Sequence, residues 1–256
     1  MGVWRIRAIA ENGQTFHLLD EESGPIFIEE GGLSGMNATR AETAFQVVGR
    51  DGQVPTTTRF DALKPQFNLV MRDWGAQSCG QVWADWWAAW QRPVTVVVEG
   101  GMGPLRAVFR RPRDASMDVW SYQPDDEGLI KLSWSMVSDD GLWFKDMVMP
   151  GPEVEVSNWG SSVVCPEVVW SRSSGRVTAG GDSFMLLYNS EVRRLSLDAA
   201  SSYLVTDADG VVDDSLWRRM RKSVHATPIF PGSTRKFVLP EGARLEWRIG
   251  LEHPWW

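Results

Sequence analysis

The sequence predicts an all-β fold with a minor helical part, arranged as an N-terminal β-barrel with one helix and a C-terminal β-sandwich. Short apolar segments alternate with clusters of Gly, Asp and Pro along the chain, a pattern typical of antiparallel sheets. One segment of the first half instead repeats its tryptophans at helical spacing. Two prolines flanking a glycine near residue 150 separate the halves. We therefore expect two domains, residues 1–150 and 151–256.

The N-terminal half contains seven strand candidates, each short and bounded by turn-forming residues. They are Val3–Ala8, Phe16–Leu19, Ala44–Val48, Asn68–Met71, Val94–Glu99, Leu105–Arg110 and Leu129–Val137. Helical patterns do not alternate with these strands, so a barrel or sandwich is favoured over strand–helix–strand units.

One helix is predicted near residues 78–91, SCGQVWADWWAAWQ, where Arg92-Pro93 ends the pattern. Four tryptophans recur three and four residues apart: Trp83, Trp86, Trp87 and Trp90. An aromatic stripe at this spacing is usually core, so we expect the helix to pack its indoles onto the barrel. A stacking surface for a ligand is the alternative.

The C-terminal half contains eight further strand candidates, which suit a β-sandwich or jelly roll. They are Ser162–Cys165, Val168–Ser171, Arg176–Ala179, Phe184–Tyr188, Val192–Asp198, Tyr203–Thr206, Arg235–Leu239 and Arg244–Gly250. Asp213 and Asp214 precede the basic segment Leu216–Lys222, and this polarity complements a helix dipole. A short surface helix is therefore expected there.

Composition excludes several classes of function. The formal net charge of −7 argues against a surface that neutralises phosphates, so sequence-specific nucleic-acid binding is not expected. No run of about 18 apolar residues occurs, so membrane insertion is not expected either. The N-terminus lacks the apolar core of a secretory signal. Cys79 and Cys165 are far apart in the sequence and indicate no disulfide framework. We expect folding in a reducing cytoplasm.

Motifs for catalysis, cofactors and metals are missing from the sequence. The acids of Asp207–Asp213 resemble a calcium loop, but the spacing of the ligands is wrong, and Asp209-Gly210 favours a hairpin turn. Gly100–Gly103 is followed by Pro104 and a strand, so it is expected to be a hairpin connection rather than a phosphate-binding loop. The acidic clusters at 125–128 and 139–141 have turn composition. We expect no enzyme activity, cofactor or metal.

Two segments are candidates for contacts between subunits. Gly31–Gly35 is expected to be a glycine-rich loop, either close-packed at a subunit contact or simply flexible. The second candidate is the loop expected at Asp51–Thr58. The residues that we select from these segments are Gly31, Gly32, Leu33, Asp51 and Thr57.

The order of these parts resembles the distal tail protein family of long-tailed bacteriophages, and in particular the minor tail proteins of phages that infect actinobacteria. The first half is similar to the family's ring-forming β-barrel. The segments that carry this likeness are the helical segment, Gly31–Gly35, Arg50-Asp51-Gly52 and Phe67–Arg72. The second half resembles the galectin-like β-sandwich appended to the ring. The segments that carry this likeness are Asn158–Gly160, Pro166–Val168, Gly180–Asp182, Val192–Asp198, Leu216–Met220, Pro228–Ser233 and Pro254–Trp256.

The resemblance implies a structural protein of the virion, made in the host cytoplasm and located at the phage tail tip. It would form a homo-hexameric ring joining the tail tube protein to tail-tip proteins, tail-associated proteins and receptor-binding proteins. Edge strands of the barrel would meet across subunits, and an acidic lumen would let DNA pass without sticking. Trp159-Gly160 matches one pair of the galectin sugar site, so Trp159 is a possible ligand contact for a host surface glycan.

Two other classes of function stay open on the sequence alone. The 15 tryptophans suit a carbohydrate-binding module with exposed indoles, although most of them are expected in cores. A hydrolase of cell-wall polysaccharide would need two carboxylates about 5 to 10 Å apart across a cleft, and no pair in the sequence stands out.

Overall fold

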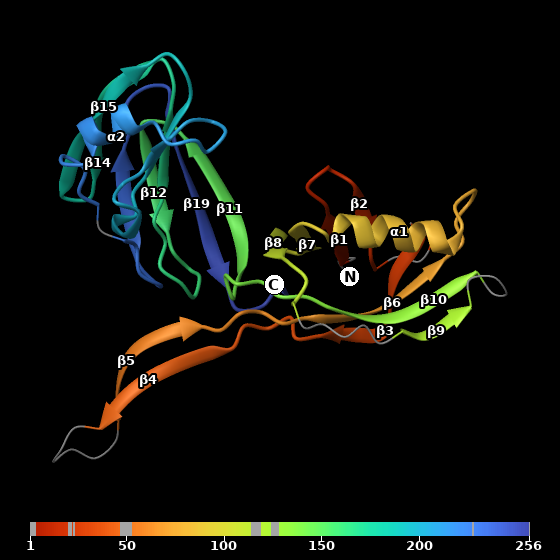
Figure 1. Ribbon diagram of the computed structural model, residues 1–256. Coiled ribbons are helices and arrows are strands. Elements are labelled where there is room, and N and C mark those ends of the chain that lie inside the picture. The colour runs from red at the N-terminus through yellow and green to blue at the C-terminus, as the bar shows by residue number, and fades with distance from the viewer. Residues whose placement is uncertain are drawn as a thin grey trace. The chain divides into compact units, whose positions relative to one another are not determined.

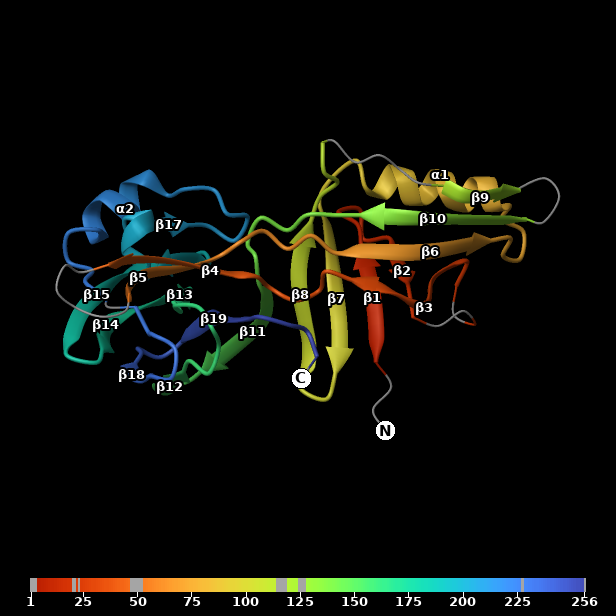
Figure 2. The same cartoon turned by 90° about the horizontal axis from the view of Figure 1, so that it is seen from below.

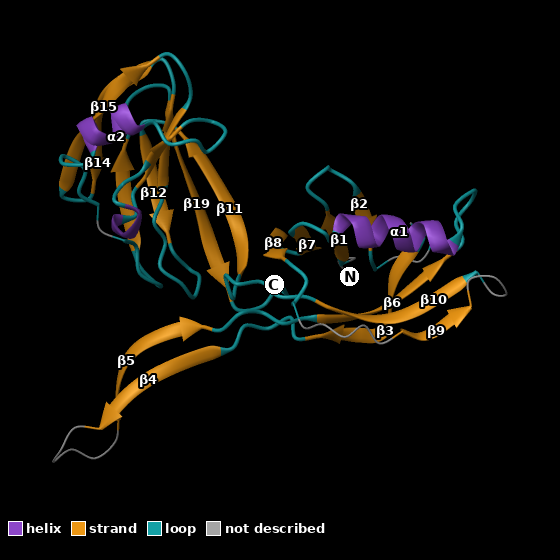
Figure 3. Cartoon of the chain, in the orientation of Figure 1, coloured by secondary structure: helices purple, strands orange, loops and turns teal. Residues whose placement is uncertain are grey.

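The computed structural model describes residues 4–19, 22, 24–46, 53–113, 119–123, 128–226 and 228–255. Most of these residues lie in β-strands, and the helical part is small (Figure 3). The all-β class with a minor helical part is thus confirmed. The chain divides into two compact units, Met1–Trp143 with Glu252–Trp256 and Phe144–Leu251.

The boundary between the units differs from the division expected at residue 150. Strand β11 (Trp143–Pro150) belongs to a sheet of the second unit, and Gly151-Pro152 after it form the corner leading to β12 (Glu153–Ser157). A corner between strands and a linker between domains use the same turn residues, so the sequence does not distinguish them. The C-terminus returns to the first unit, where Trp255 packs edge-on against Trp4 at 5.4 Å.

Most strands of the first unit lie in two antiparallel sheets, in the orders β2-β1-β7-β8 and β3-β6-β10-β9. The strands of the first sheet are β1 (Arg5–Ile9), β2 (Thr15–His17), β7 (Val94–Gly100) and β8 (Gly103–Phe109). Those of the second are β3 (Ile26–Ser34), β6 (Gln66–Arg72), β9 (Val119–Gln123) and β10 (Leu129–Ser135).

Backbone hydrogen bonds join these two sheets at both sides. The amide of Ile28 donates to the carbonyl of Leu18 at 2.7 Å, and Arg110 and Val137 exchange two bonds of 2.9 Å. The strands of the two sheets run in crossing directions (Figure 2). The barrel expected for the N-terminal half therefore has a partly closed form.

Helix α1 (Cys79–Ala89) confirms the predicted helix and its aromatic core. Ser78 caps its N-terminus by accepting a hydrogen bond from the amide of Gln81. Trp86 and Trp90 are 0% and 2% exposed, and both rings pack against Trp134 of β10. In Figure 1 the helix lies alongside β6 and β10. The stripe is thus mainly core.

A separate hairpin extends from the first unit. Strands β4 (Arg40–Gln46) and β5 (Gln53–Phe60) pair with each other and, among the described residues, form a two-stranded sheet of their own. The pair leads away from the sheet that contains β3 and β6 (Figure 1). Isolated hairpins are marginally stable in water, so this one is a candidate for burial against another surface.

The second unit is a sandwich of two antiparallel sheets, ordered β17-β16-β13-β19-β11 and β12-β18-β14-β15. The strands not yet given are β13 (Glu167–Trp170), β14 (Ser173–Ala179), β15 (Asp182–Asn189), β16 (Arg193–Ser196), β17 (Val205–Thr206), β18 (Thr234–Val238) and β19 (Ala243–Leu251). Alternate side chains are buried, as expected for strands with one face in a core. The buried set includes Val154, Val177, Phe184, Phe237, Leu195, Leu245 and Ile249.

Several strands were not anticipated from the sequence. Strands β9 and β12 were missed, and Gly31–Ser34 and Gln53–Thr58 are strand where loops were expected. Some candidates are shorter than expected: for example, only Val205–Thr206 of 203–206 is strand, and Val164 of 162–165 forms a single bridge with Ile229. A short 3-10 turn, η1 (Ala199–Ser201), precedes β17.

The second helix, α2 (Asp214–Met220), confirms the short helix expected after the two aspartates. Asp213 is its N-cap, and its carboxylate accepts from the amide of Leu216 at 3.0 Å and from Arg193 at 2.9 Å. These two hydrogen bonds, the backbone one foremost, hold the pKa of Asp213 below its ordinary value.

This lowered pKa predicts a pH-dependent cost of Asp213→Asn. Asparagine keeps a cap acceptor but loses the charge that Arg193 binds, so the free energy of unfolding should fall by about 1–2 kcal/mol at pH 7. The carboxylate contributes stability above the unfolded-state pKa of about 3.9 and loses it as the pH falls through the lowered folded value. Denaturant unfolding at pH 7 and pH 3 checks this: the difference from wild type should shrink at pH 3. Asp214→Asn, at the exposed ion pair with Arg218, is the control and should cost little at either pH.

Candidate functional site

The predicted interface residues Gly31, Gly32 and Leu33 lie in an irregular part of β3. Between Ile28 and Leu33 this strand advances five residues while its partner β6 advances only from Leu69 to Phe67. The extra residues bulge out of the sheet, which the expectation of a free loop did not foresee.

The two glycines, Gly31 and Gly32, are needed for different physical reasons. Gly31 has a φ of +73°, a conformation that glycine adopts without strain. Gly32 is buried, and a Cβ built there would lie 2.8 Å from the carbonyl oxygen of Glu29 and 2.9 Å from the Cβ of Asn68. Gly32 therefore allows the bulge to close onto β6.

The bulge opens a hollow on the surface of about 410 Å³. It is lined by Leu19, Phe27, Ile28, Glu29, Glu30, Gly31, Gly32 and Leu33. Leu19 is 38% exposed, and Glu30 is exposed as well. Glu29 binds Lys131 at 3.0 Å. The hollow thus has apolar walls and an acidic rim, a composition suited to a protein contact.

The other interface candidates fall on or beside the β4–β5 hairpin. Thr57 lies in β5 and pairs with Thr43, next to a register shift between Thr43 and Ala44. Asp51 lies outside the described residues. The base of the hairpin is fixed by Arg40, which contacts Glu252 at 2.6 Å. Thr57 therefore belongs to the hairpin and not to the hollow.

Trp159, the possible ligand contact, belongs to the second unit and is 40% exposed. Its neighbour Asn158 is buried, and its side-chain amide donates to the carbonyls of Ser162 and Ile229, both at 2.8 Å. Gly160 packs against Gly250, where a Cβ would lie 2.5 Å from the carbonyl oxygen. The indole is thus presented on a firmly held loop.

The residues that line the hollow beside Gly31, Gly32 and Leu33 were not selected from the sequence. Leu19 and Glu30 come from different segments, and only the bulge of β3 brings them to one surface. The one local signal was the glycine pair itself, which indicates a close backbone approach but not its partner.

The segments that resemble chemical motifs have structural roles. The carboxylate of Asp207 accepts from the amides of Asp209 and Val211 within a turn where Gly210 has a φ of +82°. Gly100 and Gly103 close the β7–β8 hairpin. Asp139 binds Arg110 through two bonds of 2.8 Å, and that hydrogen bonding lowers the pKa of Asp139. The acids at 125–127 lie outside the described residues.

Both cysteines are free. Burial raises the pKa of Cys79 to about 11 and also raises that of Cys165, so neither thiol is activated as a nucleophile. In the described part of the chain, no group of three or more His, Cys, Asp and Glu side chains is placed to hold a metal ion. None of its helices is long and apolar enough to cross a membrane.

The fold formed by these two units is similar to that of solved structures, whereas the sequence alone finds no match. No protein-family model and no curated protein matches the sequence. Among solved structures, the Dit protein of phage SPP1, described as a paradigm of the hub of the adsorption apparatus in phages that infect Gram-positive bacteria, is similar with a TM-score of 0.59 and 12% identity. The match covers 96% of this chain and 98% of that one.

Chains of the phage p2 baseplate in its activated conformation are similar as well. The structure with calcium matches with a TM-score of 0.58 and the one with strontium with 0.59, both at 9% identity. Each covers 98% of this chain and 99% or 100% of the other. The likeness therefore includes both units and concerns the fold.

The close packing of Gly32 predicts that Gly32→Ala destabilises the first unit. Because the added methyl group meets backbone atoms, the cost should be about 1–3 kcal/mol, measured by denaturant unfolding. Gly181→Ala is the control, since a Cβ there has no neighbour within 4 Å, and its cost should be small. Equal stabilities of the two variants would contradict the close approach.

Proposed function

We propose that this protein is a structural component of a phage tail tip, forming a homo-hexameric ring between the tail tube and the tip proteins that contact the host. The observation that carries the proposal is the match of both units, over nearly their full length, to a phage adsorption hub and to phage baseplate chains. The function is mechanical and involves no catalysis. The partners would be the tail tube protein, tail-associated proteins and receptor-binding proteins.

Two surfaces of the first unit support a ring. A closed ring requires two different complementary patches on each subunit. The hollow at the bulge of β3 offers an apolar depression with an acidic rim, and the β4–β5 hairpin offers paired strands that have no further strand beside them among the described residues. We propose that these surfaces contact neighbouring subunits. Gly31, Gly32 and Leu33 would lie in one contact and Thr57 in the other.

Light scattering of the purified chain over a range of concentrations tests self-assembly. The expected mass is that of a hexamer, six times 28.8 kDa. A trimer of three times 28.8 kDa that doubles to a hexamer as the concentration rises would also agree with the proposal. A mass of one chain at every concentration would contradict the proposal.

Charge reversal on the rim of the hollow tests that contact. Glu30→Arg should lower the assembled mass, because Glu30 is exposed on the rim, and should leave the circular dichroism spectrum unchanged. Glu155→Arg, an exposed reversal in the second unit, is the matched control and should assemble like wild type. If Glu30→Arg also assembles normally, the hollow is not the contact.

For the second unit we propose, as a second candidate function, contact with a host surface glycan through Trp159. An exposed indole on a held loop can stack on the apolar face of a sugar ring. Most other tryptophans are less exposed: among the described side chains, only Trp74 and Trp159 are large exposed indoles. On a glycan array, wild type should bind a defined set of glycans and Trp159→Ala should lose the signal. If wild type binds no glycan, the glycan hypothesis is wrong and the second unit is assigned to contacts with other proteins.

A further inference from the structure

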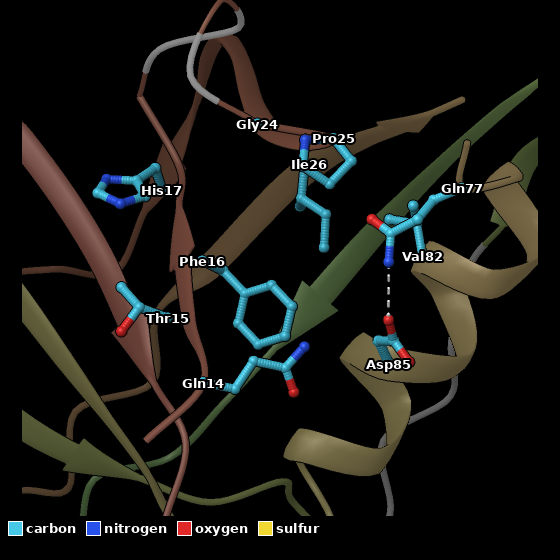
Figure 4. A pocket seen from close by; sticks show the side chains of 10 residues that line it. All are labelled: Gln14, Thr15, Phe16, His17, Gly24, Pro25, Ile26, Gln77, Val82 and Asp85. Atoms are coloured by element: carbon cyan, nitrogen blue, oxygen red, sulfur yellow. Dashed lines mark hydrogen bonds between the residues drawn. The ribbon is translucent and has the colours of Figure 1, made fainter. Parts of the chain in front are cut away.

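A second cavity of the first unit lies between β2, the start of β3 and the first turns of α1 (Figure 4). It is lined by Gln14, Thr15, Phe16, His17, Gly24, Pro25, Ile26, Gln77, Val82 and Asp85. Its volume of about 160 Å³ exceeds the roughly 10–15 Å³ that one water needs, but lies below the roughly 300 Å³ at which drug-sized ligand sites begin. The cavity therefore suits a group of a few heavy atoms.

The walls of this cavity are apolar on one side. Phe16, Ile26 and Val82 are 8%, 1% and 2% exposed, so their side chains form a firm surface. The ring of Phe16 points toward the helix in Figure 4, and its position is fixed by an edge-to-face contact with Trp86 at 5.1 Å. An aromatic ring at a polar cavity favours a cation over an anion.

The opposite wall carries a carboxylate whose charge is not compensated. Asp85 is half-buried, and its one hydrogen bond in the described structure is from the amide of Gln77 at 3.3 Å. No ion pair of Asp85 occurs among the described residues. Gln14 and Gln77 add amide groups that can accept hydrogen bonds. The other ionisable lining group, His17, is exposed, and its ring points away from the cavity in Figure 4.

We infer that this cavity binds the guanidinium group of an arginine side chain supplied by another protein chain. A planar guanidinium would meet the carboxylate of Asp85 with its N–H groups and stack against Phe16 with its face. The small volume of the cavity suits a guanidinium better than a whole nucleotide, and the negative charge of Asp85 disfavours a phosphate or a carboxylate. This inference does not depend on ring assembly.

Two-dimensional amide NMR of the full chain tests the site with N-acetylarginine methylamide as the probe. The expected result is saturable shifts of the amide signals of Phe16, His17, Val82 and Asp85. The citrulline analogue has the same shape without the charge and should cause none. Asp85→Asn keeps the size of the side chain and should weaken binding at least tenfold. Glu155→Gln, far along the sequence and in the second unit, is the control and should bind like wild type.

Three outcomes would overturn the inference: no saturable shifts, equal shifts with the citrulline analogue, or undiminished binding by Asp85→Asn. Circular dichroism and thermal unfolding of Asp85→Asn show that the variant is folded before binding is compared. Light scattering then identifies the source of the arginine. A lower assembled mass of Asp85→Asn points to a second copy of this chain, and an unchanged mass points to a different protein.

Discussion

The first unit depends on the burial of Trp86 between its two sheets. This side chain contacts Phe16 from β2 on one side and Trp134 from β10 on the other, so one helical residue ties both sheets to α1. Burial of large aromatic side chains is worth several kcal/mol each. Among the described residues, the indole N–H groups of Trp86, Trp90 and Trp134 have no hydrogen-bond partner, which costs about 1–3 kcal/mol for each group. Apolar area and ring contacts must therefore outweigh this cost.

That arrangement also positions the surfaces assigned to function. Phe16 is both a neighbour of Trp86 and a wall of the cavity that contains Asp85. Leu18, two residues later, bonds to Ile28, and the bulge of β3 begins there. The cavity and the hollow thus lie along the same two strands, held by the same core. Surfaces built on firm elements keep their geometry in an assembly.

The elements that could be predicted from the sequence are those with local signals. Helix α1 follows from the spacing of its tryptophans, and α2 follows from its aspartate cap. The glycines at 31 and 32 misled the interpretation because glycine marks both loops and bulges, and only the partner strand β6 decides between them. Strand β5 contains Pro55, a residue that argues against a strand unless it lies at an edge or bulge.

The candidate site was predictable only in part, for a related reason. Gly31, Gly32 and Leu33 were selected because glycine pairs indicate close packing, whereas Leu19 and Glu30 carry no signal until the fold brings them together. Asp85 could not be selected from the sequence for the same reason. It is one acid in an aromatic helix, and only the fold places it in a cavity with Phe16 and Gln77. Assembly surfaces depend on such long-range neighbours, which a single sequence does not display.

Electron microscopy of the purified full-length chain, at concentrations where light scattering detects assembly, tests the proposed role most directly. Class averages of a closed ring with six-fold symmetry and a central opening are the expected result. Single copies alone, or open filaments without a closed ring, would contradict the account of this protein as a ring-forming component of a phage tail.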